Sequence, residues 1–461
     1  MAGDARTPGL PRVLLVILDG LADRPWPELD GLTPLEAART PNLDGLASSA
    51  ATGLMHPLGR GRAPGSDLAH FVLFGYPEAL YPGRSVFEAA GDGVELSTDE
   101  VAFRALFCTT ERREDGSLVL ARHFAAVSDE VCRELAEEIA AFEHGGLSLR
   151  LTFTRDRQGI LTVRGSGAAS GGAASQHVTD CDPFFPGRPV AAVRPLTGAP
   201  DPDAALRTAE AVTAYLRHAY RALSAHPLSR GAPPERRADF VLVKWTGRRR
   251  PLPRFESLTG MRGASVSTGT LFRGLAAGLG LAHREPPYLP DPAEDLTGRI
   301  AEAARAFEDG ADFVHVHTKA PDEAGHRKDP RGKRDVIARL DEALAALLPA
   351  ARDRAPMPGA PALPRDTLVV VTADHGTPAG TGLIHSGDPV PLLLLGPCVR
   401  PDGVTLFGEG ACAEGVLGQF EGRDLMPMLL NLRGTTRYLG ARLHPDAGPA
   451  WPGTYEPFTV E

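Results

Sequence analysis

Four short runs of apolar residues constrain the fold of this chain more than any other feature of its sequence. They read VLLVILD, DFVHVH, TLVVVTAD and PVPLLLLG, at positions 13–19, 312–317, 367–374 and 389–396. Continuous apolar character, without alternation, is typical of parallel strands that are covered on both faces. Helical patterns lie between the runs, such as VIARLDEALAALL at 336–348. Strands and helices in alternation predict an α/β fold built on a parallel sheet.

The middle of the chain has a different pattern. From about residue 99 onward, shorter and more polar strand-like segments surround one helix near 128–142. We therefore expect a smaller α+β domain at 99–236, inserted between two parts of the sheet domain at 1–98 and 237–461. The apolar run DFVLVKW at 239–245 is expected to resume the large sheet.

Composition limits the partners of the chain. The net charge of −9 argues against a general role on nucleic acids or membrane surfaces, although it does not exclude a small anionic substrate held by local cations. No apolar run reaches the roughly 18 residues of a membrane-spanning helix. The five cysteines are scattered and show no CxxC spacing, which favours reduced thiols in a cytoplasmic protein. The oligomeric state cannot be deduced from the sequence.

Polar residues with metal-ligating side chains follow two of the apolar runs directly. Asp19 ends the first run, and Asp374 and His375 end the third, with His385 ten residues further on. Ligands of α/β proteins gather at the carboxyl ends of the strands, so these side chains are candidates for one shared site. The alternative for each is a strand-end turn with polar groups that face solvent.

Two further segments carry candidate residues. Ser66 in APGSDLAHFVLFGY precedes a helix-like stretch, and a helix N-terminus suits an anionic group. The alternative is a simple helix cap. In KAPDEAGHRKD, Asp322 and His326 are four residues apart and share one helical face, which is also common for a surface hydrogen bond.

Taken together, these residues change the interpretation. One α/β sheet would bring them to the same edge, and carboxylates, imidazoles and a hydroxyl in this number are enough to hold two divalent ions. Two metals beside a serine oxygen would lower its pKa and balance charge on a phosphoryl group during in-line displacement. The sequence thus predicts a metal-activated serine nucleophile, with these ligands: Asp19, Ser66, Asp322, His326, Asp374, His375 and His385.

The chain also resembles a known family. Its segments ILDGLADRP, TPLEAARTPNLDGLA, PGSDLAHFVLFGY, VAFR, DEAGH, TADHGTP, HSGDPVPLLLLGP and GRDLMPMLLNL are similar, in order, to archaeal-type 2,3-bisphosphoglycerate-independent phosphoglycerate mutases of the alkaline phosphatase superfamily. The resemblance implies an alkaline-phosphatase-like, mostly parallel sheet sandwiched by helices, with an inserted substrate or transferase domain. It also implies a phosphoserine intermediate and two divalent ions, usually manganese, magnesium or zinc.

Carried over by motif, the resemblance assigns roles to individual residues. One ion would be held by Asp19, Ser66, Asp374 and His375, and the other by Asp322, His326 and His385. Lys319 would reach the transferring group as a point charge. The candidates for contacts with the anionic groups of a small phosphorus-containing substrate are Arg84, Arg104, Arg122 and Lys244.

The departures from the family pattern concern substrate recognition. A segment that usually reads Asp-Arg-Arg-Ala-Gly-Arg is ARHFAAV here, so that Arg122 alone remains of three arginines. Two further family patterns have become HVTDCDPFF at 177–185 and KWTGRRRP at 244–251. One interpretation is a specialised transferase of phosphonate biosynthesis, which moves a phosphonoformyl group from a CMP ester to 3-phosphoglycerate. Ordinary interconversion of 2- and 3-phosphoglycerate and a non-catalytic binding relative are the alternatives.

Overall fold

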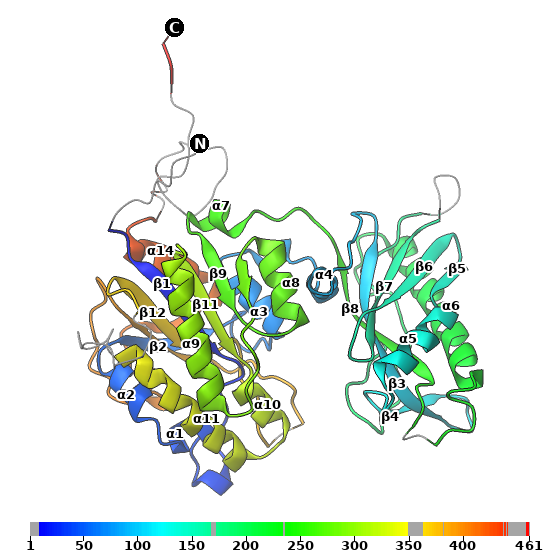
Figure 1. Ribbon diagram of the computed structural model, residues 1–461, viewed down its shortest axis with the longest axis horizontal. Helices are drawn as coiled ribbons and strands as arrows, with labels where there is room; N and C mark the ends of the chain where they lie inside the picture. Colours follow the sequence, from blue (N-terminus) through cyan, green and yellow to red (C-terminus); the bar gives the residue numbers. More distant parts are fainter. Residues whose placement is uncertain are drawn as a thin grey trace. The chain divides into compact units, whose positions relative to one another are not determined.

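The computed structural model describes residues 9–166, 172–233, 236–348, 363–380, 382–436, 438, 440 and 458–460. The chain divides into two compact units, Met1–Tyr81 with Leu252–Glu461, and Pro82–Pro251 (Figure 1). The predicted class, an α/β protein with a mostly parallel sheet between helices and a smaller inserted α+β domain, is confirmed. The unit boundaries lie before α4 (Arg84–Gly91) and after β8 (Phe240–Arg248), so the inserted unit is longer at both ends than residues 99–236.

The larger unit contains an eight-stranded sheet with the order β10-β9-β11-β1-β12-β13-β2-β14. Three of the predicted strands form its centre, where β1 (Arg12–Leu18) lies between β11 (Phe313–Thr318) and β12 (Thr367–Thr372) and runs parallel to both. All three are buried along nearly their whole length. The remaining strands are β2 (Ala51–His56), β9 (Gly263–Val266), β10 (Ala282–Arg284), β13 (Val390–Leu395) and β14 (Gly418–Glu421).

The expectation that all four apolar runs are parallel strands is wrong for β13. This strand is antiparallel to both of its neighbours, β12 and β2. Parallel strands need a long crossover connection, usually a helix, and the described residues between β12 and β13 form bends and isolated bridges without a helix. The apolar pattern reports burial on both faces, which is equally present in a central antiparallel strand.

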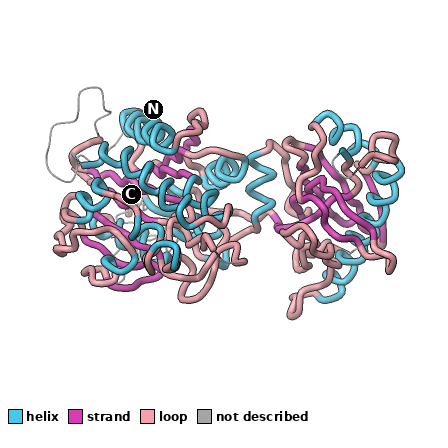
Figure 2. Tube along the Cα trace, turned by 90° about the horizontal axis from the view of Figure 1, so that it is seen from below, coloured by secondary structure: helices cyan, strands magenta, loops and turns pink. Residues whose placement is uncertain are grey.

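Two groups of helices pack on this sheet, and Figure 2 shows strands inside each unit with helices around them. In one group α3 (Ser66–Leu73) contacts both other helices, which are α8 (Thr270–Leu279) and α14 (Gly422–Arg433). The other group is centred on α11 (Pro330–Leu344), which covers most of the predicted helix at 336–348. Its further members are α1 (Pro34–Ala37), α2 (Pro41–Ala47), α9 (Pro292–Glu308) and α10 (Ala320–His326).

The inserted unit is built on a six-stranded antiparallel sheet. The order of five of its strands is β4-β3-β7-β6-β5. The sixth strand, β8, pairs with the long strand β3 (Val101–Arg112). The helices are α4, α5 (Asp129–Glu138) and the long α6 (Pro202–Ala225), which packs against β8. The shorter strands are β4 (Leu118–Arg122), β5 (Ala141–His144), β6 (Leu147–Phe153) and β7 (Gln158–Gly165).

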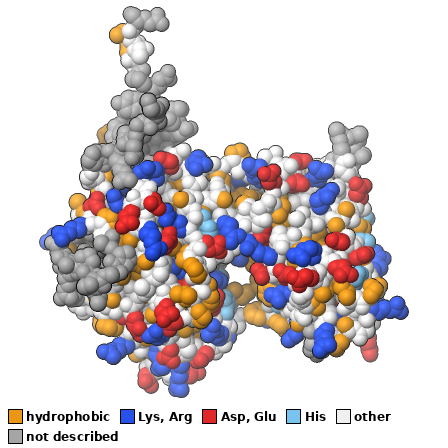
Figure 3. Space-filling model, in the orientation of Figure 1, with side chains coloured by type: hydrophobic (Ala, Val, Ile, Leu, Met, Phe, Trp, Pro, Cys, Tyr) orange, Lys and Arg blue, Asp and Glu red, His pale blue; other side chains and the backbone are white. Residues whose placement is uncertain are grey.

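The expected return to the large sheet at 239–245 is wrong, because β8 completes the sheet of the inserted unit. Its first residues are buried between β3 and α6, and this coverage produces the same continuous apolar run as a strand of the large sheet. Among the described helices, none is both long and apolar enough to cross a bilayer. Basic and acidic side chains are interspersed on the face drawn in Figure 3.

Candidate metal centre

The predicted ligands come from neighbouring strands of the large sheet. Asp19 follows β1, Asp374 and His375 follow β12, and Asp322 lies on α10, directly after β11. Since these strands are adjacent and parallel, their carboxyl ends meet at one edge of the sheet. Ser66 reaches the same place as the first residue of α3. The structure therefore brings together side chains separated by hundreds of positions in the chain.

Asp19, Asp374 and His375 form the first group of candidate ligands. Nε2 of His375 lies 3.2 Å from Oδ1 of Asp19 and 3.4 Å from Oδ2 of Asp374. The hydroxyl of Ser66 lies 3.2 Å from the same nitrogen. All four side chains are buried. The oxygen and nitrogen atoms of these side chains that could ligate a metal face one another, as atoms that bind one small cation do.

Asp322, His326 and His385 form the second group. Oδ1 of Asp322 lies 3.1 Å from Nε2 of His326 and 3.6 Å from Nε2 of His385. Nδ1 of His385 lies 2.7 Å from the carbonyl oxygen of Pro64, which can only accept a hydrogen bond. Nδ1 therefore carries a hydrogen, which leaves Nε2, on the side of Asp322, as the ring nitrogen available to ligate a metal.

Two side chains join the groups into one cluster. The ammonium of Lys319 lies 3.2 Å from Oδ2 of Asp19 and 2.9 Å from Oδ2 of Asp322. The hydroxyl of Thr377 donates to Oδ1 of Asp322 at 2.7 Å and lies 3.3 Å from Nδ1 of His375. The rings of His375 and His385 stack with their centroids 3.6 Å apart. All seven predicted ligands and Lys319 thus belong to one site.

The charges of this cluster are unbalanced without a cation. Among the described residues, Asp19, Asp322 and Asp374 are three buried carboxylates of this cluster, and the ammonium of Lys319 pairs with the first two. Burial and the charge of Asp19 raise the pKa of Asp374 well above its ordinary value. Burial alone would also raise the pKa of Asp19, but the charge of Lys319 and the hydrogen bond from His317 hold it far below the usual range. The pKa values of these two adjacent carboxyl groups thus shift in opposite directions, which indicates that the cluster lacks positive charge.

The donor set fits divalent metal ions. Oδ1 of Asp19 and Oδ2 of Asp374 are buried and accept no hydrogen bond from the described residues, which is costly unless another partner is present. Burial, followed by the charge of His385, lowers the pKa of His375 to about 3, so this imidazole is neutral and able to ligate. Carboxylate oxygens with imidazole nitrogens suit manganese, magnesium or zinc.

Sequence reasoning missed three polar residues of the site. His317 donates to Oδ2 of Asp19 at 2.9 Å, and Nδ1 of His70 donates to the carbonyl oxygen of Ser66 at 2.6 Å. The buried ammonium of Lys333 donates to the backbone carbonyls of Gly20, Ala22 and Thr377 and ties the loops after β1 and β12 together. The spacing of His70, four residues after Ser66 on one helix, was an available signal.

The four predicted substrate-binding residues lie in the inserted unit. The guanidinium of Arg84 lies 3.6 Å from the ring centre of Trp245, and Nζ of Lys244 lies 4.1 Å from it. Arg104 is buried and pairs with Glu88 and Asp92, so its charge is already balanced within the unit. Arg122 is exposed at the end of β4. Their roles in substrate binding stay predictions.

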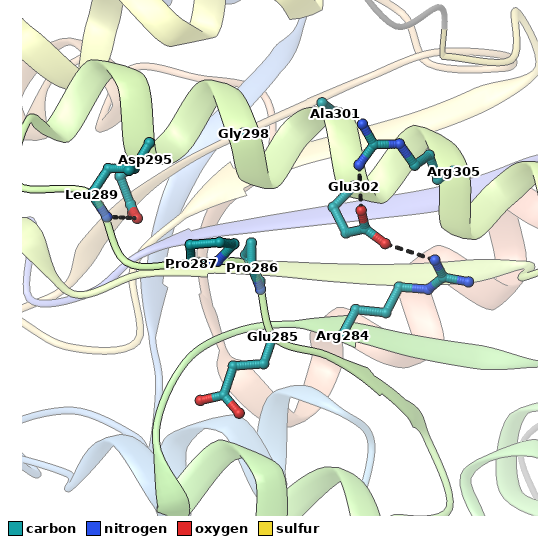
Figure 4. Close-up of a pocket in the computed structure, with 10 residues that line it drawn as sticks. All are labelled: Arg284, Glu285, Pro286, Pro287, Leu289, Asp295, Gly298, Ala301, Glu302 and Arg305. Carbon is teal, nitrogen blue, oxygen red and sulfur yellow. Dashed lines mark hydrogen bonds and ion pairs between the residues drawn. The ribbon is translucent and has the colours of Figure 1, made fainter.

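A separate pocket in the larger unit contains none of the predicted residues. It lies between β10 and α9, and Figure 4 shows Arg284 and Arg305 turned toward opposite oxygens of Glu302. These ion pairs measure 2.7 Å and 2.5 Å, and Arg284 also pairs with Asp309, so both cations have acidic partners. The pocket is therefore not part of the candidate metal centre.

The fold and the polar cluster define an α/β enzyme with its site at the carboxyl edge of a mostly parallel sheet. A family model described as 2,3-bisphosphoglycerate-independent phosphoglycerate mutase matches residues 47–229. A relative of that name from Methanopyrus kandleri is 39% identical over 95% of this chain and 100% of its own length. Another from Methanoculleus marisnigri is 36% identical over 93% and 99%. The chain belongs to the family of 2,3-bisphosphoglycerate-independent phosphoglycerate mutases.

Solved structures agree with this assignment. A protein from Pyrococcus horikoshii is 29% identical, with a TM-score of 0.71 over 94% of this chain and 100% of its own. A cofactor-independent phosphoglycerate mutase from Thermoplasma acidophilum is 31% identical, with a TM-score of 0.58 over 92% and 100%. The resemblance inferred from the motifs and the prediction of a phosphoglycerate mutase-like enzyme are confirmed.

Proposed function

We propose that this protein interconverts 2- and 3-phosphoglycerate through a phosphoserine at Ser66. The observation that carries this proposal is the buried Ser66 hydroxyl beside Asp19, Asp374 and His375, in a chain whose full-length relatives are named as phosphoglycerate mutases. Those relatives favour the ordinary interconversion over the specialised transferase that the altered recognition segments suggested.

Two divalent ions, manganese, magnesium or zinc, are part of the proposal. Asp19, Ser66, Asp374 and His375 would hold one, and Asp322, His326 and His385 the other. Bound there, the ions would supply positive charge that lowers the pKa of the serine hydroxyl and balances the phosphoryl oxygens. The balance of three carboxylates against one ammonium supports this part of the proposal.

In the proposed reaction, Oγ of Ser66 forms a bond to phosphorus while the bond from phosphorus to the glycerate oxygen breaks. The proton of the serine hydroxyl passes to the departing alkoxide, which leaves as an alcohol. The glycerate then reorients, and its other hydroxyl attacks the phosphoserine in the reverse of this step. Lys319 neutralises charge on the transferring group, and the N-terminal end of α3, where Ser66 is the first residue, would favour its negatively charged oxygens.

The residues of the inserted unit are proposed to recognise the glycerate. Its phosphate and carboxylate groups need cationic partners, and Arg84, Arg104, Arg122 and Lys244 are the candidates. Lys244 is the preferred candidate, because contacts on several sides fix the position of its ammonium. It lies 2.6 Å from Oδ2 of Asp182 and is flanked by two aromatic rings. The cytoplasmic location expected from the cysteines also stays a prediction.

A second candidate function keeps the chemistry and changes the substrate. It is the transfer of a phosphonoformyl group from a CMP ester to 3-phosphoglycerate. The observation in its favour is that Trp245 and Phe184, which stand in the altered segments, flank Lys244 and both have positive φ angles. Aromatic residues adopt this conformation rarely, and such strain is concentrated at functional sites. The third alternative, a non-catalytic relative, is disfavoured because the candidate ligand set is complete.

The deciding experiment uses the full chain supplied with manganese. Phosphorus NMR should show 2-phosphoglycerate converted into 3-phosphoglycerate, and mass spectrometry should find a phosphoryl group on Ser66. An absence of conversion with manganese, magnesium and zinc overturns the mutase proposal. If a CMP ester of phosphonoformate then leaves a carboxyphosphonyl group on Ser66, the second candidate replaces it.

A further inference from the structure

Two histidines on β11 are buried in the larger unit although nothing in the proposed reaction uses them. His315 and His317 are two residues apart, so their side chains lie on the same face of the strand. Their exposures are 0% and 2%, and both rings contact His70 of α3 edge-on. A buried imidazole is costly unless its nitrogen atoms have partners. The partners of the two residues differ.

His317 is hydrogen-bonded to a candidate metal ligand. Its Nε2 lies 2.9 Å from Oδ2 of Asp19, and because a carboxylate only accepts, this nitrogen carries the hydrogen. The ammonium of Lys319 lies 3.2 Å from the same oxygen. Oδ2 is thereby occupied by two donors. Oδ1 is left as the oxygen of Asp19 that faces His375, and it accepts no hydrogen bond from the described residues.

The ring of His317 is itself held in place. Phe272 of α8 packs on it with the ring centroids 3.9 Å apart and the planes inclined by 37°. A donor held in this way fixes the orientation of the Asp19 carboxylate.

His315 has the same burial and a different partner. Its Nδ1 lies 3.0 Å from the hydroxyl of Ser265 on β9, and this hydroxyl lies 2.9 Å from that of Ser267. No carboxylate is among its described hydrogen-bond partners. His315 is therefore a matched control for His317 from the same strand and the same face.

We propose that His317 is a positioning residue that presents Oδ1 of Asp19 to the first metal ion. The inference rests on the proposed function, since it requires an ion held by Asp19, Asp374 and His375. Hydrogen-bond partners of metal ligands fix ligand orientation, and their loss typically weakens metal affinity by about 10- to 100-fold.

The test is calorimetric titration of the dialysed, substrate-free full chain with manganese. His317→Phe keeps the volume and removes the donor, and we expect manganese to bind about 10- to 100-fold more weakly. His317→Gln should restore most of the affinity, because its amide nitrogen takes the place of Nε2. His315→Phe should stay within about threefold of the wild type. Should His317→Phe fail to fold, His317→Asn gives the same contrast with Gln, because its shorter amide does not reach Asp19.

The outcomes are separable. A wild-type protein that binds no manganese overturns the proposed metal site, and this inference with it. Manganese binding by the wild type that is unchanged in the His317 variants overturns the inference alone. Equal losses in His315→Phe and His317→Phe, without rescue by Gln, also overturn it, because they would reflect packing of the core and not orientation of Asp19.

Discussion

The hydroxyl of Ser66 lies 3.2 Å from Nε2 of His375, the distance of a serine from its general base in many hydrolases. Burial and the neighbouring His385 lower the pKa of His375 to about 3, however, which makes this imidazole a poor proton acceptor at neutral pH. The same nitrogen also faces Asp19 and Asp374. The geometry thus favours a nucleophile activated by a shared cation over one activated by histidine.

Replacing Ser66 by alanine should abolish turnover and the covalent phosphoryl adduct. The expected reduction in kcat is at least about 10³-fold, because no other side chain can take over a nucleophile that forms a covalent intermediate. Manganese should still bind, since the carboxylates and imidazoles remain. The measurements are kcat with 2-phosphoglycerate, the mass of the intact protein and a manganese titration. Turnover of the variant near the wild-type rate would contradict the proposed nucleophile.

Replacing Asp374 by asparagine should affect the stability of the protein differently with and without metal. In the metal-free protein the change removes one of three crowded carboxylates, and the raised pKa of Asp374 shows that its charge is disfavoured there. The melting temperature without metal should therefore rise or stay unchanged. Saturating manganese at about 100 times its Kd should stabilise the wild type by about 2.7 kcal/mol per site and the variant by much less. Equal stabilisation of both by manganese would exclude Asp374 as a ligand.

The strand-end ligands were predictable because they interrupt apolar runs. Asp19 and Asp374 stand where β1 and β12 end, and the α/β pattern alone predicts that such positions meet at one edge. His317 was hidden because it lies within a strand, and its partner Asp19 is 298 positions away in the chain. Nothing local distinguishes it from His315, which bonds to a serine.

The pairing of strands was less predictable than their existence. β13 and β8 both read as continuous apolar runs, but this pattern reports coverage on two faces and not direction or neighbours. The direction of β13 depends on a connection without a described helix, and the place of β8 depends on its long antiparallel register with β3. Such non-local choices leave no periodic signal in one sequence.

Glu409 should make the stability of the protein depend on pH. This half-buried side chain accepts hydrogen bonds from the Thr33 hydroxyl and the backbone N–H of Asp23, and burial raises its pKa from 4.5 to about 7. Between these values the unfolded chain loses the proton while the folded chain keeps it, so stability is full below about pH 4.5 and falls as pH rises to about 7. After allowance for screening, the free energy of unfolding is expected to fall by about 2 kcal/mol over this pH range.

The variant Glu409→Gln should remove this part of the pH dependence, because its amide does not ionise, and its oxygen can accept from the backbone N–H of Asp23 while its NH2 group donates to the Thr33 hydroxyl. Thermal melting of wild type and variant from pH 5 to pH 8 measures the difference in slope. Arg62 and Glu78 form an exposed ion pair elsewhere in the same unit, and Glu78→Gln is the control that should leave the slope nearly unchanged. Parallel curves for wild type and Glu409→Gln would contradict the prediction.

Replacing Lys244 by methionine should weaken substrate binding without affecting the metal centre. Lys244 is 5% exposed, and its ammonium lies 2.6 Å from Asp182, which also accepts from His123 at 2.7 Å. A charged hydrogen bond to the glycerate would be worth about 1.5–3 kcal/mol, so KM should rise by about 10- to 100-fold while manganese affinity stays at the wild-type value.

This variant also leaves Asp182 buried with one partner fewer, so a loss of stability must be separated from a loss of binding. The double variant Lys244→Met with Asp182→Asn removes the unpaired carboxylate and should recover much of the melting temperature, yet KM should remain high. If KM returned with the stability, Lys244 would serve the fold of the inserted unit and not the substrate. If KM were unchanged in both variants, Lys244 would not bind the substrate, and a neighbouring cation would be the better candidate. Arg84 is such a cation, because it contacts the same Trp245 ring as Lys244.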